Sequence, residues 1–182
     1  MSPELTEQLQ TMAAMTQILT LQPPKIITKH STLIILPGSN EDAEGGPEEA
    51  RIIRAVQWWA LGRTSQPILV AAPNRKEVSN GGFYSRQRIK DITGLWVFEE
   101  SLFVANKEAA RHTPDQLNWA CEIINNFDSP PERIVLSTAT YHMARAFLTL
   151  LVAMRKAGLH CKVSVLPTLD IENLSREMLP GA

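Results

Sequence analysis

The chain of 182 residues is predicted to fold as an α/β domain: a Rossmann-like three-layer sandwich with helices on both faces of one mainly parallel sheet. Short apolar runs rich in β-branched residues alternate with longer stretches of helical periodicity. The runs show little alternation with polar residues, which is typical of strands buried on both faces. Because crossover connections are right-handed, five such strands favour the order 3-2-1-4-5.

The composition favours one compact domain in a reducing environment. The formal net charge is −1, with 18 basic and 19 acidic residues, so nothing in the overall charge indicates nucleic acid. No run approaches the roughly 20 apolar residues of a membrane span, and the N-terminus lacks the basic start of a signal peptide. Cys121 and Cys161 fall inside predicted elements without CxxC spacing. We therefore expect a cytoplasmic protein whose partner is a small molecule, with no nucleic acid and no membrane.

Residues 1–22 are predicted to form an N-terminal amphipathic helix ahead of an α/β domain over residues 23–182. Ser2 suits the N-cap and Pro3 the first helical position. One face carries apolar residues at three- and four-residue steps, namely Leu5, Leu9, Met12, Met15 and Leu19. Such a face must be covered, either by the main domain or by a second copy in a homodimer.

The remaining elements follow one another in strand–helix order. Strands are predicted at residues 32–36, 67–72, 101–105, 134–136 and 161–166, and helices at 47–62, 83–94, 114–127, 141–158 and 169–179. Pro47 and Pro114 suit first helical positions, and Thr113 is the predicted N-cap before Pro114. A polar turn over residues 137–140 is expected between the fourth strand and its helix, which ends at Gly158.

The predicted sheet order also locates a site. Ligands of open α/β sheets bind beyond the carboxyl ends of the strands, where the strand order reverses, here between the first and fourth strands. We therefore expect one crevice lined by Gly38, Ser39, Thr138, Tyr141 and His142. His142 and Arg145 share a helix face, and the N–H groups at the start of that helix suit an anion.

Simpler interpretations of these residues stay open. Gly38 is compatible with an ordinary turn, His142 with a structural histidine, and Arg145 with an ion pair to a neighbouring helix. His112, Thr113 and Asp115 fit a helix start equally well. The four histidines lack metal-binding spacing, so no metal is expected, and GxGxxG, GxxxxGKS/T and GxSxG motifs are absent. Neutral polar groups with Arg and His suit an anionic or nucleotide-like small molecule.

Residues 138–146, TATYHMARA, resemble the TSxYHMxRA signature of the YdcF-like (SanA/ElyC/YdcF) bacterial domain family, whose function is poorly defined. Residues 51–62, RIIRAVQWWALG, are similar to its first-helix motif RxxRAxxLxxxG, and residues 113–116, TPDQ, to its TxEN motif. Residues 33–38 resemble its first strand and glycine turn. The resemblance spans roughly residues 32–167 and implies a Rossmann-like fold with polar site residues at strand ends. It also implies a role in envelope biogenesis or binding of a nucleotide-type ligand such as S-adenosylmethionine.

The chain departs from the family pattern in one half of the implied site. Pro73-Asn74 replace a glycine pair, Lys107 an acidic residue, and Ala110 a serine. His112 replaces an asparagine, and Asp115-Gln116 end the TxEN motif. The candidate ligand-binding residues are therefore Gly38, Ser39, Arg51, Asn74, Lys107, His112, Thr113, Asp115, Gln116, Thr138, Tyr141 and Arg145, with His142 as the candidate catalytic residue.

Three functional hypotheses follow from these residues. The first is a small-molecule-binding protein, transferase-like in one form, in which Arg51 or Arg145 pairs with a phosphate or carboxylate. The second is a hydrolase-like enzyme acting on a phosphorylated envelope precursor, with His142 catalytic. The third is a non-enzymatic scaffold with a degenerate site, assembled through residues 1–22. The sequence leaves the cofactor unknown, with S-adenosylmethionine or another nucleotide-type ligand as the candidate.

Overall fold

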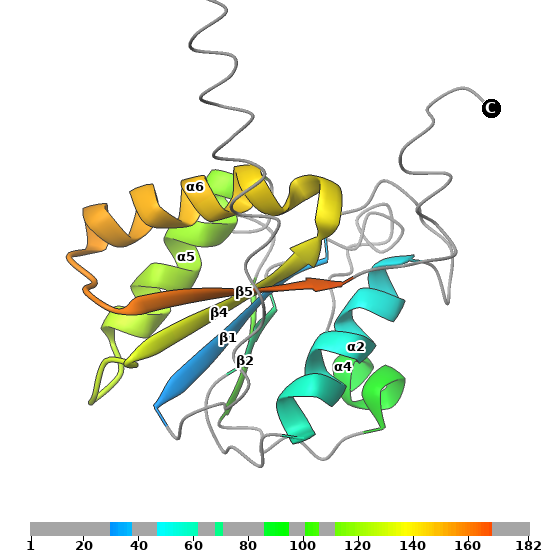
Figure 1. Cartoon of the computed structure of the whole chain (residues 1–182). Helices are drawn as coiled ribbons and strands as arrows, with labels where there is room; N and C mark the ends of the chain where they lie inside the picture. Colours follow the sequence, from blue (N-terminus) through cyan, green and yellow to red (C-terminus); the bar gives the residue numbers. More distant parts are fainter. Residues whose placement is uncertain are drawn as a thin grey trace, which may run out of the picture.

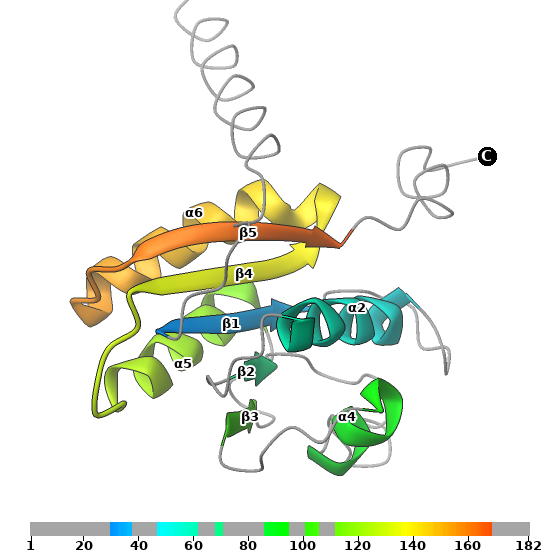
Figure 2. The same ribbon diagram turned by 60° about the horizontal axis from the view of Figure 1, so that its bottom comes forward.

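The computed structural model describes residues 30–37, 47–61, 68–70, 86–94, 101–105 and 112–168. Within them lies a five-stranded sheet in the order β3-β2-β1-β4-β5, and every neighbouring pair is parallel. The strands are β1 Ser31–Leu36, β2 Ile68–Val70, β3 Leu102–Val104, β4 Arg133–Ala139 and β5 Lys162–Thr168 (Figure 2). The predicted strand order and parallel sheet are confirmed.

Four helices are described, two on each face of the sheet (Figure 1). The helices α5 Thr113–Asn125 and α6 Thr140–Ala157 pack on one face. The other face carries α2 Pro47–Leu61 and α4 Arg86–Thr93. The predicted three-layer sandwich is therefore confirmed. The predicted helices over residues 1–22 and 169–179 lie outside the described residues.

The central strands supply apolar side chains to two separate cores, which explains their continuous apolar runs. In β1, Ile34 and Leu36 pack with α5 and α6, whereas Leu33 and Ile35 pack with α2. All four side chains are buried. Burying an aliphatic side chain of this size contributes about 1.5–3 kcal/mol, so a strand buried on both faces is strongly fixed in register.

The polar turn predicted over residues 137–140 is wrong. Ser137 and Thr138 instead continue β4, and the chain enters α6 directly at Thr140. Ser137 pairs with Ile35 on one side and Leu166 on the other, and Thr138 has a partner on both sides as well. The two flanking strands supply hydrogen-bond partners for the backbone of these residues. This strand pairing outweighs the tendency of their polar side chains to form a turn.

The predicted N-cap of α5, Thr113, is also wrong by one residue. The cap is His112, in an extended conformation with φ −137° and ψ 154°, and its side chain makes no capping hydrogen bond. The Gln116 N–H donates to the His112 carbonyl over 2.9 Å, which begins the helix. Thr113 is the first helical residue, and its hydroxyl contacts another helix instead. The prediction that α6 ends at Gly158 is confirmed, since Gly158 is its left-handed C-cap.

Candidate functional site

The switch point of the sheet lies between β1 and β4, as predicted. β1 pairs with β4 along its whole length, from Ser31 opposite Arg133 to Leu36 opposite Thr138. Beyond this last pair, β1 leads into Pro37 and β4 leads into the first turn of α6. The candidate site is therefore built around the carboxyl ends of these two strands, with α2 on one side and α5 and α6 on the other.

Arg51 of α2 connects the two sides of this edge. Its side chain is only 3% exposed, and its Nη1 donates to the Pro37 carbonyl over 3.0 Å. The guanidinium carbon lies 5.9 Å from the centre of the Tyr141 ring, within reach of a cation–π contact. Arg51 thus fixes the end of β1 relative to the start of α6.

His142 links α6 to α5. Its Nε2 lies 3.1 Å from the Thr113 hydroxyl, in a contact in which either the hydroxyl or the imidazole N–H donates. Burial, and then the positive charge of Arg145, lower the pKa of His142. Both causes disfavour the protonated form, so the imidazole is neutral at physiological pH. A neutral imidazole can donate at one nitrogen and accept at the other.

The other predicted site residues on described elements lie at different depths. The Tyr141 ring is 58% exposed, and Arg145 is exposed one turn further along α6. Thr138 is buried at the end of β4. At the start of α5, Gln116 is buried, whereas His112 and Asp115 are exposed. The predicted residues Gly38, Ser39, Asn74 and Lys107 lie outside the described residues.

Ser137 is a residue of this edge that was absent from the predicted site. It is completely buried between β1 and β5, and its Oγ has no hydrogen-bond partner among the described residues. Buried hydroxyl groups are normally paired, so an unpaired one at a strand end requires an explanation. The sequence signal for this residue is its position directly after the apolar run Ile134–Leu136. It was missed because Ser137 was assigned to the predicted turn.

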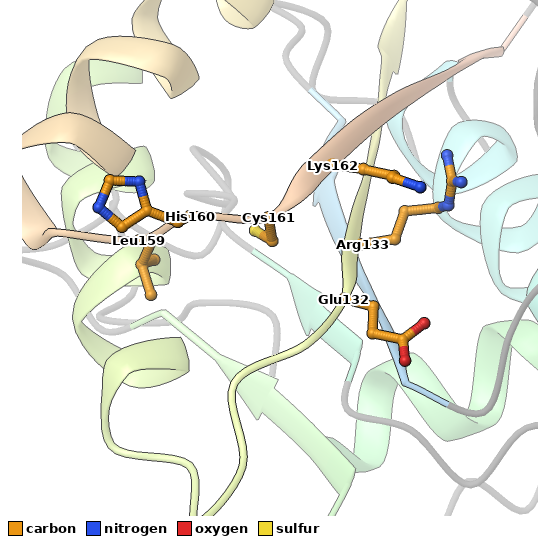
Figure 3. A pocket seen from close by; sticks show the side chains of 6 residues that line it. All are labelled: Glu132, Arg133, Leu159, His160, Cys161 and Lys162. Carbon is orange, nitrogen blue, oxygen red and sulfur yellow. The ribbon is translucent and has the colours of Figure 1, made fainter.

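A hollow of about 620 Å³ lies at the opposite edge of the sheet, at the amino ends of β4 and β5 (Figure 3). It is lined by Glu132, Arg133, Leu159, His160, Cys161 and Lys162. Arg133 donates through Nη1 to Ser164. Open parallel sheets bind ligands at their carboxyl edge, so topology places the candidate site away from this hollow.

Both cysteines are free thiols. Burial, followed by the nearby Cys161 and Glu122, raises the pKa of Cys121 to about 12. Burial also raises the pKa of Cys161. Since the thiolate is the nucleophilic form, neither side chain is activated for attack at neutral pH.

Together, the sheet and its four described helices define an α/β protein of Rossmann-like architecture. No protein-family model and no curated protein matches the chain. The resemblance to the YdcF-like family therefore stays a prediction.

Among the described helices, none is long and apolar enough to cross a membrane. The described part of the chain also contains no group of three or more His, Cys, Asp and Glu side chains placed to hold a metal ion.

Proposed function

We propose that the protein binds an anionic or nucleotide-type small molecule at the carboxyl edge between β1 and β4. The observation that carries this proposal is the presence of two side-chain contacts at the switch point: Arg51 against Tyr141, and His142 against Thr113. They come from α2, α5 and α6, so the fold holds in one place polar side chains that are distant in the sequence.

The start of α6 supplies the anion-binding part of the site. Its N-cap is Ala139, whose methyl side chain cannot accept a hydrogen bond from the first-turn N–H groups. Those N–H groups and the positive end of the helix dipole favour a phosphate or carboxylate. Arg145 adds a positive charge on the exposed side of the same helix.

Tyr141 and His142 supply the part that favours a nucleotide. An exposed aromatic ring can stack on a base, and stacking accepts any base because each has a π-face. The neutral His142 imidazole provides a hydrogen-bond partner for a sugar hydroxyl without adding charge. The resemblance of residues 138–146 to the YdcF-like signature supports S-adenosylmethionine as the first ligand to test.

The test is thermal denaturation of the full chain in the presence of nucleotides, S-adenosylmethionine and sugar phosphates. A ligand at about 100 times its Kd should add about 2.7 kcal/mol to the free energy of unfolding. The double variant His142→Ala/Arg145→Ala should lose this response. The matched control is Arg155→Ala, which removes an exposed arginine from the last turn of α6 and should keep it.

Two results would contradict the proposal: no shift with any compound, or an equal shift in the double variant and the wild type. The nucleotides and sugar phosphates should also be assayed for phosphate release. Turnover that His142→Ala abolishes would replace binding with hydrolysis as the function of this edge.

A further inference from the structure

One helix face of the described structure is uncovered and apolar. Within the described residues, the large hydrophobic side chains that are exposed all lie on α6: Tyr141 at 58%, Leu148 at 52%, Leu151 at 40% and Val152 at 55%. Leu148, Leu151 and Val152 are three and four residues apart and form a continuous outer stripe. Ala146, Leu150 and Ala153 of the same helix point into the core. A clustered apolar face of this kind marks an interaction surface.

Residues 3–20 have the complementary pattern. They lie outside the described residues, and their sequence places five apolar residues on one helical face, from Leu5 to Leu19. As a helix, the stretch from Leu5 to Leu19 is about 21 Å long. The α6 surface from Tyr141 to Val152 extends over about 17 Å. Two apolar faces of similar length can therefore cover each other.

The described part of the chain begins at a position that allows residues 3–20 to contact α6 of the same molecule. The His30 carbonyl accepts hydrogen bonds from the N–H groups of Glu132 and Arg133, at the amino edge of the sheet. The end of α6 lies at the same edge, because Gly158 leads into β5 (Figure 1). Residues 23–29 reach up to about 23 Å when extended. This length exceeds the about 8–10 Å that separates the axes of two packed helices.

Charge favours the same pairing. Residues 3–20 contain Glu4 and Glu7 and no Lys or Arg. The exposed side of α6 carries Arg145, Arg155 and Lys156 next to the outer stripe. If the connector keeps residue 20 near the end of α6, a helix over residues 3–20 would run parallel to α6. Glu4 and Glu7 then lie towards Arg145, so opposite charges flank the apolar contact.

We propose that residues 3–20 form a helix that docks on the outer stripe of its own α6. In this arrangement Met12 lies opposite Leu148, at the middle of both faces. The docked helix removes Leu148, Leu151 and Val152 from water and brings its first turn to the rim of the candidate site beside Tyr141. The inference stands on α6 and on residues 3–20, so it does not depend on the proposed function.

The test is disulfide formation in the full chain between Met12→Cys and Leu148→Cys, in a Cys161→Ser background because Cys161 is partly exposed. Under mild oxidation the pair should form one intrachain disulfide, detected by mass spectrometry and non-reducing gels. The control pair is Met12→Cys with Gln57→Cys, an exposed position of α2 on the opposite face of the sheet. We expect the Leu148 pair to react on the order of tenfold faster than this control.

Adding Val152→Glu to the Leu148 pair should lower its rate to that of the control, because it places a charge inside the contact. Two outcomes would overturn the proposal. Equal rates for both pairs would show that residues 3–20 do not dock on α6. An interchain disulfide between mixed chains, one with Met12→Cys and one with Leu148→Cys, would assign the stripe to a second copy.

Discussion

His142 shows how the position of one side chain sets its chemistry. Burial and Arg145 lower its pKa below 6.5, so the folded protein binds this proton less tightly than the unfolded chain does. Below pH 6.5 the unfolded state therefore carries more protons than the folded state. By linkage, the free energy of unfolding decreases as the pH is lowered. We predict a decrease in stability below pH 6.5 that is smaller in His142→Gln, measured by urea denaturation as a function of pH.

Two neighbouring variants separate the causes of this pH dependence. Thr113→Val removes the hydroxyl but leaves the imidazole buried, so it should keep most of the decrease. Arg145→Gln removes the smaller cause and should reduce the decrease only in part. Identical pH profiles for wild type and His142→Gln would contradict the assignment of the effect to His142.

Ser137 lets stability and binding be measured at the same position. Its buried Oγ has no hydrogen-bond partner in the described part of the chain, so Ser137→Ala should raise the free energy of unfolding by about 1 kcal/mol. If the hydroxyl serves the ligand, the same change should weaken the ligand-induced thermal shift. Urea denaturation and the ligand titration measure the two effects.

Thr32 provides the matched control for Ser137. Its Oγ1 is also buried and unpaired among the described residues, but it lies near the amino end of β1, away from the candidate site. Thr32→Val should therefore stabilise the protein and leave the ligand response unchanged. A loss of stability in Ser137→Ala would show that its hydroxyl is paired in the folded chain.

At the scale of the element, the end of α6 depends on the backbone of Gly158. Its φ of 69° and ψ of 22° lie in the left-handed region, and the following Leu159 N–H donates to the Met154 carbonyl over 2.9 Å. A Cβ at Gly158 would meet nothing within 4 Å, so substitution acts through the backbone alone. Gly158→Ala should cost about 1 kcal/mol in urea denaturation. Gly158→Asn should cost less, and equal stability of all three proteins would contradict this account.

The sequence predicted the described elements well and their ends less well. Apolar periodicity and proline or glycine positions are local signals, and they located α2, α4 and the strand cores. They failed at Ser137 and Thr138, whose polar side chains indicate a turn but whose backbones pair with both neighbouring strands. They also failed at Thr113, because its hydroxyl contacts His142 instead of capping α5.

At the scale of the whole molecule, handedness and strand count predicted the sheet order and hence the edge where the candidate site lies. Of the predicted site, the structure brings Arg51 and Tyr141 together and places His142 against Thr113. The proposed docking of residues 3–20 belongs to this scale too, because it joins the start of the chain to its last described helix.

The sequence by itself determined the α/β class, the alternation of elements and the strand ends that face the switch point. The first two follow from side-chain periodicity, which is a local property of the sequence. The third follows from the right-handedness of crossover connections, which applies to all chains. Only the tertiary structure decided that Arg51 donates to the Pro37 carbonyl, that the buried Ser137 hydroxyl has no hydrogen-bond partner among the described residues, and that the outer face of α6 is apolar and exposed. Each of these depends on packing between residues far apart in the chain. The burial of a side chain is set by elements that are distant from it in the sequence, so its sequence neighbours do not predict it.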